Sequence, residues 1–381
     1  MLSRLTTICV LGQESMNVLS RIVLIILVCS CYLRVAPVVQ AETPDATFRV
    51  VGYYAGRTIP VDSFETEKLT HLIWCFGQLE GNRFSIRTAV DSSIIKSMVR
   101  LKEKHPSLKV MLSLGGWGGC EMCSDVFSSE NAREEFAKSV REVSDYFQTD
   151  GIDLDWEYPV VRGFPGHRYS IEDRDHFTEL LRSLRVINRP GFEISFAAGG
   201  FTAYLDSSIA WYEVLPYVDF INIMSYDLVH GYSIISGHHT PLYSTPQQTE
   251  STDHAVQELL KKGVPSEKLV IGAAFYARVF KINVPITEGL YQSCKFDHTF
   301  SYKNLHDTLT LGKYELRFDT VANAPYAIQR ERGVLATFDD ENSVALKTRY
   351  ARENHLGGIM FWQLYDDKFY GGLLDIINRS K

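Results

Sequence analysis

Three carboxyl groups stand at every second position in a segment that begins at Asp150 and ends at Pro159. If this segment is a strand, its side chains alternate between two faces, so Asp153, Asp155 and Glu157 point to the same side. The apolar residues between them point to the other side. Carboxyl groups this close cannot all ionise freely, so one of them stays protonated near neutral pH and can act as a general acid.

The acidic face of this segment is interpreted as buried, not as the solvated face of an edge strand. The strands predicted on either side are apolar, and a closed parallel sheet has no exposed edge. Burying unpaired carboxylates is costly, so the cluster should share protons or have a catalytic role. Glu157 is nearest to the carboxyl-terminal rim, where barrel active sites lie, and is the predicted acid. Asp150 falls outside the alternation, and we expect it to have a supporting or structural role.

Eight short apolar runs alternate with helix-like segments, which is the pattern of parallel strand–helix units. These runs are residues 49–55, 70–77, 108–114, 151–157, 192–198, 219–226, 268–276 and 357–363. Between them, residues 131–147 and 171–188 carry apolar side chains at three- and four-residue intervals, as amphipathic helices do. No Gly-x-Gly-x-x-Gly fingerprint follows the first run, so we predict an α/β fold of the closed (β/α)8 barrel type and not an open doubly wound sheet.

One interval, residues 281–340, breaks this alternation. It is rich in Tyr, Phe, Thr and Asp, and a helical period resumes only at residues 341–354. Because long structureless segments are rare inside compact domains, we predict a small α+β domain inserted after strand seven. The catalytic barrel is predicted to occupy residues 42–381, with this insertion inside it.

The amino-terminal residues 1–41 have the pattern of a signal peptide. After Met16, an alternative start codon, an apolar run over residues 22–33 leads to a small-residue cleavage site at residues 39–41. The run is too short to span a bilayer as a mature helix. A lipid anchor at Cys31 is the competing interpretation, because the preceding residues loosely resemble a bacterial lipoprotein box. We therefore expect a protein that is secreted or held at the cell envelope.

The charge balance restricts the possible partners. Without residues 1–41, the chain has 36 basic and 45 acidic residues, a net charge of −9. Such a surface disfavours nucleic acid and anionic membranes as partners.

Cysteine and histidine spacing gives little support to a metal site. In an exported protein, Cys120 and Cys123 could close a small disulfide. A zinc site there is disfavoured, because no second Cys or His pair at ligand spacing accompanies them. The neighbouring His238 and His239 lack an acidic partner at ligand spacing, so a structural role or a place at the rim of the substrate site is favoured for them.

Residues Asp150 to Glu157 match Asp-x-x-Asp-x-Asp-x-Glu, which resembles the signature of the chitinases of glycoside hydrolase family 18. Other segments resemble motifs of this family at predicted strand ends, namely Ser113–Gly116, Met224–Asp227, Tyr276–Arg278 and Gly358–Trp362. Ala277 departs from the pattern, since the family often has Gly there. The resemblance covers nearly all of the chain after residue 41, and the insertion is similar to the small domain of deep-groove chitinases.

This resemblance implies a retaining hydrolysis of chitin in which the substrate supplies the nucleophile. The acetamido carbonyl of the sugar would attack the anomeric carbon while Glu157 protonates the leaving oxygen. Glu157 would then activate water against the oxazolinium ion. Asp155 would hold the acetamido N–H, Tyr226 would bind the acetamido oxygen, and Asp153 would exchange a proton or hydrogen bond with Asp155. No metal or organic cofactor is implied, and we expect a monomer that binds chitin or N-acetylglucosamine oligosaccharides.

The candidates for substrate contact are Trp362, Trp117, Tyr54, Met224, Asp227 and Arg278. Trp362 resembles the tryptophan floor beneath the reacting sugar. For Trp117 and Tyr54, core packing explains the residue type equally well. Asp227 and Arg278 could contact sugar hydroxyl groups or form a salt bridge at the rim.

Two other functions fit the same barrel. Endo-β-N-acetylglucosaminidases that act on N-glycans share the acidic signature, but the insertion and the Met-x-Tyr-Asp pattern favour chitin. Chitin-binding lectins of this fold typically lack the acid, so the presence of Glu157 favours turnover.

Overall fold

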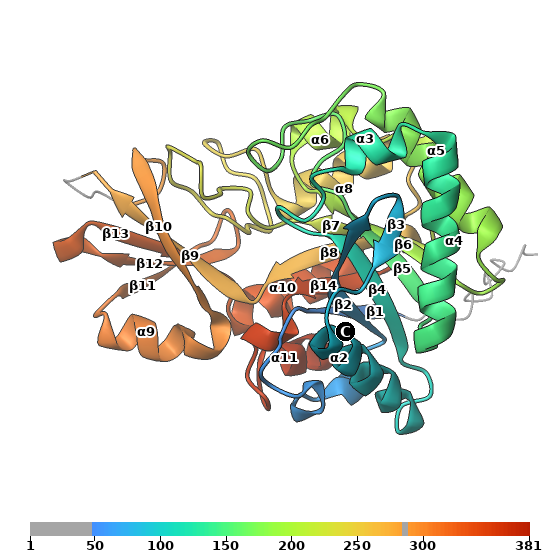
Figure 1. Cartoon of the computed structure of the whole chain (residues 1–381). Coiled ribbons are helices and arrows are strands. Elements are labelled where there is room, and N and C mark those ends of the chain that lie inside the picture. The colour runs from blue at the N-terminus through green and yellow to red at the C-terminus, as the bar shows by residue number, and fades with distance from the viewer. Residues whose placement is uncertain (1–47, 284–288) are drawn as a thin grey trace, which may run out of the picture. The chain divides into compact units, whose positions relative to one another are not determined.

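Eight parallel strands close into a barrel in the computed structural model, which describes residues 48–283 and 289–381 (Figure 1). The predicted signal peptide over residues 1–41, with Cys31, lies outside the described residues. The barrel strands are β1 (Arg49–Tyr54), β2 (His71–Glu80), β4 (Lys109–Gly115), β5 (Gly151–Asp155), β6 (Glu193–Gly199), β7 (Phe220–Met224), β8 (Leu269–Ala274) and β14 (Gly358–Trp362). β1 pairs with both β14 and β2, which closes the sheet. The predicted barrel and all eight of its strands are confirmed.

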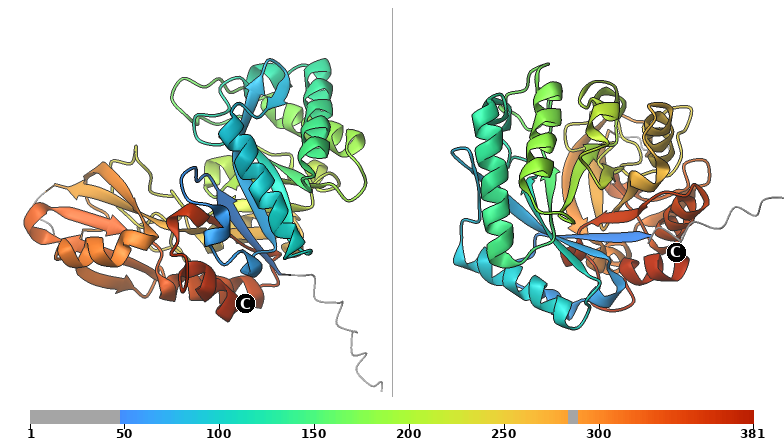
Figure 2. Two further views of the ribbon diagram at one scale, coloured as in Figure 1. Left: turned by 60° about the horizontal axis from the view of Figure 1, so that its bottom comes forward. Right: turned by 90° about the vertical axis from the view of Figure 1, so that its right-hand side faces the viewer.

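Helices surround the barrel strands, as Figure 2 shows. The longer helices are α2 (Ala89–Arg100), α4 (Glu130–Phe147), α5 (Asp173–Ile187), α8 (Thr252–Lys261), α10 (Glu341–Glu353) and α11 (Leu373–Ser380). Shorter helices are α3 (Cys123–Phe127), α6 (Thr202–Ser207) and α7 (Trp211–Val214), and a short strand β3 (Arg83–Ser85) pairs with β2. None of the described helices is long and apolar enough to cross a membrane.

The alternation of side chains along β5 separates the core into two layers. Ile152, Leu154 and Trp156 belong to the large apolar cluster between the strands and the helices. Asp153 and Asp155 are buried on the opposite face, inside the barrel. The structure therefore has the acidic face and the apolar face that were predicted for this strand.

A second, antiparallel sheet forms the small domain between β8 and α10. Its strands follow the order β10 (Cys294–Ser301), β9 (Tyr276–Ile282), β13 (Val334–Thr337), β12 (Ala324–Gln329) and β11 (Glu315–Asp319), accompanied by helix α9 (Leu305–Leu311) (Figure 1). This sheet begins at Tyr276, earlier than the expected residue 281. A single residue separates β8 from β9, so the apolar run predicted as strand seven extended past the end of β8 into β9. The prediction therefore did not separate the two sheets.

Candidate active site

Asp153 lies at the centre of a hydrogen-bond network inside the barrel. Its Oδ2 atom accepts hydrogen bonds from the hydroxyl groups of Tyr53 (3.0 Å) and Ser113 (2.9 Å). Its Oδ1 atom accepts from the Ser195 hydroxyl (2.6 Å) and the Asn222 amide (3.2 Å). Burial raises the pKa of Asp153, and these four hydrogen bonds oppose that increase. Asp153 is thus held by donors on the two neighbouring strands, β4 and β6, and on β1 and β7 of the same barrel.

Asp155, the next acid on the same face, is held very differently. Its buried Oδ1 atom has no hydrogen-bond partner among the residues that the structure describes. Burial and the nearby charges of Glu157 and Asp153 raise the pKa of Asp155 well above its usual range. A buried oxygen without a donor is costly, so Asp155 presents an acceptor that a ligand N–H could satisfy.

Glu157 lies two residues beyond the end of β5 and is partly exposed. Burial raises its pKa to about 7, a hydrogen bond with Tyr158 opposes the increase, and the charge of Asp227 adds to it. The leading cause is therefore loss of solvent, where the sequence suggested crowding of carboxyl groups. A carboxyl group with a pKa near neutrality is suited to act as an acid and then as a base.

Tyr226 and Met224 lie at the carboxyl end of β7, in the apolar cluster that lines the barrel interior. The Tyr226 hydroxyl donates a hydrogen bond to the Met360 sulfur at 3.7 Å, and the hydroxyl group is buried. Burial and the charge of Asp155 raise the pKa of Tyr226 well above its usual range, so it remains a neutral donor.

Trp362 ends β14 and packs against the same interior cluster. Its ring stacks on Phe76 with centroids 5.5 Å apart and an interplanar angle of 14°, and it lies 5.9 Å from the Tyr53 ring. It remains partly exposed. Trp362 is therefore a rigid aromatic surface at the end of the barrel that carries Glu157.

Asp227 and Arg278 form a salt bridge at the rim. From the sequence, this salt bridge and a contact with sugar hydroxyl groups were alternatives. The Arg278 guanidinium contacts both carboxylate oxygens, and the Tyr276 hydroxyl donates to Oδ1 at 2.6 Å. The His239 ring nitrogen Nδ1 lies 3.5 Å from the same oxygen. Burial alone would raise the pKa of Asp227, but the hydrogen bonds from Arg278 and the nearby His239 ring hold it well below its usual range.

Trp117 is half-exposed and follows β4 at the rim, so it is not part of the core. Its ring lies 5.5 Å from Phe164 and 6.4 Å from Tyr232, between centroids. These three rings come from the segments that follow β4, β5 and β7, and they form an aromatic surface at the rim.

Tyr54 does not face the barrel mouth, and this part of the site prediction is wrong. It is buried in the outer apolar layer, its hydroxyl donates to the Ile59 carbonyl, and its ring contacts those of Phe64 and Tyr365. The alternation along β1 points Tyr53 inward instead.

The sequence reasoning missed the residues that hold Asp153, namely Tyr53, Ser113, Ser195 and Asn222. Three of them share one detectable signal, because Ser113, Ser195 and Asn222 are polar residues in the middle of otherwise apolar strands. Polar side chains that are fully buried inside a barrel require polar partners.

Asp150 has the structural role that we expected. Its carboxylate binds the Lys102 ammonium at 2.8 Å and accepts the backbone N–H of Val110 at 2.8 Å. It therefore ties the start of β5 to β4 and to the segment after α2.

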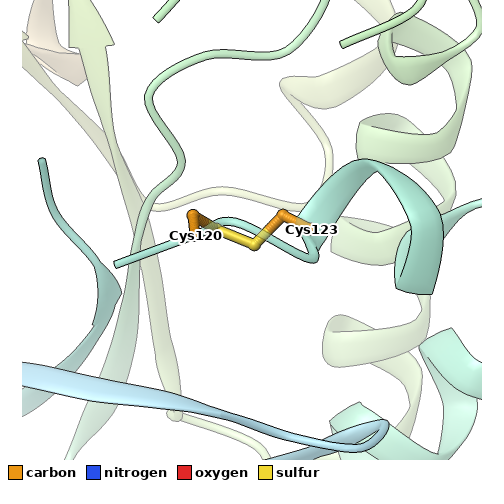
Figure 3. The surroundings of a disulfide bond; sticks show 2 residues. All are labelled: Cys120 and Cys123. Atoms are coloured by element: carbon orange, nitrogen blue, oxygen red, sulfur yellow. A yellow bond between two sulfur atoms is a disulfide. The ribbon is translucent and has the colours of Figure 1, made fainter. Parts of the chain in front are cut away.

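Cys120 and Cys123 are joined by a disulfide where the segment after β4 leads into α3 (Figure 3). Cys75 and Cys294 are free thiols. His238 bonds to Asp319 at 3.1 Å. Among the described residues, no group of three or more His, Cys, Asp or Glu side chains could hold a metal ion.

Fold and site together define a (β/α)8 glycoside hydrolase with an acidic strand at its centre. The pattern of Glycosyl hydrolases family 18 matches residues 49–367, and the chain belongs to this family. Chitinase A1 of Niallia circulans is 31% identical over 300 residues, which are 72% of this chain and 43% of that protein. The chain thus spans less than half the length of this relative.

Two solved structures are similar over almost their whole length. The family 18 N-acetylglucosaminidase from Paenibacillus barengoltzii has a TM-score of 0.79 and 31% identity, over 88% of this chain and 100% of that one. The Group IV chitinase of Ostrinia furnacalis has a TM-score of 0.81 and 26% identity, over 87% and 99%. The resemblance read from the sequence is confirmed at the level of the family.

Proposed function

We propose that the protein is a chitinase that hydrolyses β-1,4 bonds between N-acetylglucosamine units of chitin and chito-oligosaccharides. The observation that carries this proposal is the pair formed by Asp155 and Glu157. Asp155 has a buried oxygen without a donor, and burial raises the pKa of Glu157 to about 7. An acetamido sugar would supply the missing N–H, and its glycosidic oxygen would receive the proton.

In the first step, Glu157 donates its proton to the leaving glycosidic oxygen, and the C1–O bond breaks. The acetamido carbonyl oxygen of the same sugar forms a bond to C1, which gives an oxazolinium ion and retains the proton balance. Asp155 accepts the acetamido N–H and offsets the developing positive charge. The Tyr226 hydroxyl donates to the acetamido oxygen and aims it at C1.

In the second step, the Glu157 carboxylate takes a proton from water while the water oxygen attacks C1 and the ring of the oxazolinium ion opens. The acid is thereby restored. Asp153 supports Asp155 by hydrogen bonding or proton exchange, and its four donors favour its own ionised form. These roles are performed by side chains of this chain, groups of the substrate and one water molecule.

Aromatic and polar groups at the mouth are proposed to hold the oligosaccharide. Trp362, with its rigid stacking on Phe76, suits the apolar face of the reacting sugar. Met224 contributes to the wall beside Tyr226, and half-exposed Trp117 offers a surface for a neighbouring sugar. Asp227 and Arg278, already paired with each other, would contact sugar hydroxyl groups through their remaining polar atoms.

The test is the substitution Glu157→Gln, which keeps the shape of the side chain and removes the acid. We expect hydrolysis of soluble chito-oligomers to be lost by at least about 100-fold, with binding retained in calorimetry. Undiminished turnover would contradict the mechanism. Binding without turnover by the wild-type protein would instead indicate a chitin-binding lectin.

Substrate choice is tested with three materials and the wild-type protein. Chito-oligomers should be cleaved, and fully deacetylated chitosan should not, because the internal nucleophile is missing. Cleavage of a high-mannose glycoprotein alone would indicate an endo-β-N-acetylglucosaminidase.

Export is a separate proposal that rests on residues 1–41. The apolar run and the Val-Gln-Ala site support removal of this segment as a signal peptide. Amino-terminal sequencing of the exported protein should begin at Glu42. A mature chain that begins at a lipidated Cys31 would indicate an envelope anchor.

A further inference from the structure

Asn222 lies in the middle of β7, is fully buried, and is one of the four donors to Asp153. Its amide nitrogen lies 2.9 Å from the Tyr53 hydroxyl and 3.2 Å from Asp153 Oδ1. Its amide oxygen is buried and has no hydrogen-bond partner within the described part of the chain. The nitrogen is therefore satisfied twice, and the oxygen is not satisfied at all.

This orientation follows from the chemistry of the neighbours. A carboxylate only accepts hydrogen bonds, so a flipped amide would place its oxygen against Asp153 and would lose that bond. The Tyr53 hydroxyl could then donate to the flipped amide only by giving up its own bond to Asp153. The amide orientation that binds Asp153 is kept although it leaves a buried oxygen unsatisfied, which is an unfavourable arrangement.

Asn222 also fixes the direction of the Tyr53 hydroxyl. That oxygen accepts the N–H of Asn222, so its single proton is left to point at Asp153 Oδ2, 3.0 Å away. The hydrogen bonds thus run one way, from Asn222 through Tyr53 to Asp153. Asn222 contributes to both carboxylate oxygens, directly to one and through Tyr53 to the other.

We propose that Asn222 is a positioning residue that keeps Asp153 an ionised acceptor beside Asp155. The inference rests on the proposed function. It assigns to β7 a second contribution to catalysis, separate from that of Tyr226 at the end of the same strand.

The groups that act on Asp153 determine the expected pH dependence. Tyr53 on β1, Cys75 on β2 and Asp155 on β5 are the titratable neighbours, and the Asn222 hydrogen bond lowers the pKa of Asp153. Loss of this bond raises that pKa, so Asp153 becomes protonated at a higher pH. The acid limb of the kcat profile should therefore move to higher pH.

The experiment compares Asn222→Leu with Asn188→Leu. Both side chains are buried amides with an unpaired oxygen, but the Asn188 amide bonds to the Leu184 carbonyl of helix α5 and not to a carboxylate. We expect Asn222→Leu to lower kcat on a chito-oligomer about 10- to 100-fold, with KM within about twofold. Asn188→Leu should change neither kcat nor the acid limb of the kcat profile, even if it lowers the thermal stability as much as Asn222→Leu does.

Two additional measurements keep the inference testable. If Asn222→Leu does not fold, Asn222→Ser retains one donor and should give an intermediate kcat and an intermediate acid limb. An unchanged acid limb in the folded variant would overturn the proposal. Carboxyl ¹³C NMR follows the titration of Asp153 and needs no turnover. If the titration of Asp153 is not shifted in the variant, this inference alone is refuted. An inactive wild-type protein refutes only the proposed chitinase function.

Discussion

The barrel contains two groups of carboxylates that differ in their electrostatics. On β5 and just beyond its end, burial raises the pKa values of Asp153, Asp155 and Glu157. At the rim, Arg278 holds the pKa of Asp227 well below its usual range although burial opposes this. The first group is suited to gain and lose protons, and the second to keep a fixed charge.

The difference lies in the partners and not in the residue type. Asp153 is bound by three hydroxyl groups and an amide, all neutral, whereas Asp227 is bound by a guanidinium. Neutral donors offset only part of the pKa increase that the loss of solvent causes, whereas a cation lowers the pKa by more than burial raises it. Whether a buried carboxylate is suited to proton transfer or to a fixed charge thus depends on the side chains that contact it.

The largest predicted effect is that of Asp155→Asn. This change removes the charge that would offset the oxazolinium ion, and we expect kcat/KM on a soluble chito-oligomer to fall about 100- to 1000-fold. Initial-rate kinetics would measure it. A variant with wild-type kcat/KM would show that the reaction does not need the charge of Asp155.

A stability effect is expected from Glu157→Gln. The folded-state pKa of Glu157, about 7, lies above its ordinary value of 4.5, so the folded protein binds more protons between these pH values. Its stability therefore falls as pH rises through this window, and the neutral Gln avoids the loss. We expect the variant to be more stable than the wild-type protein by about 1–3 kcal/mol at pH 8 and equal to it at pH 4. Urea unfolding at both pH values is the measurement, and a variant less stable at pH 8 would contradict it.

A smaller effect is expected from Asp227→Asn, which tests whether the rim charge acts on the acid. The negative charge of Asp227 raises the pKa of Glu157, so its removal should lower that pKa. The alkaline limb of kcat/KM should move to lower pH by less than about one unit. Movement to higher pH would show that the two groups are not coupled in this way.

The smallest effect is expected from Tyr54→Phe, with Tyr53→Phe as its matched neighbour. The Tyr54 hydroxyl donates to the Ile59 carbonyl in the outer layer, so loss of this hydroxyl should cost about 1 kcal/mol of stability and leave kcat and KM unchanged. Tyr53→Phe removes a donor to Asp153 and should lower kcat. Equal kcat and KM values for the two variants would show that the inner and outer faces of β1 do not differ in their effect on catalysis.

The sequence was sufficient for the barrel and for the face of β5, because three acids alternating with apolar residues admit one arrangement. It could not distinguish Tyr53 from Tyr54. Both faces of β1 are buried and apolar, so the strand has no polar alternation that reveals which side faces inward.

The causes of the pKa shifts were also beyond the sequence. Spacing along a strand gives the proximity of carboxyl groups, but the loss of solvent and the donors from other strands depend on how the barrel closes. Asp153 is held by residues 40, 42, 69 and 100 positions away in the chain. Such partners become neighbours only when the sheet is complete.

The unpaired oxygen of Asp155 has a consequence for the choice between sugars. A β-1,4-linked glucose chain resembles chitin in shape, but its 2-hydroxyl group is shorter than an acetamido group and carries no N–H. A site built to bond a polar group discriminates strongly against an analogue that lacks it, because the buried oxygen then stays unsatisfied. Cellulose would be rejected for the hydrogen bond that it fails to make, and not for its size.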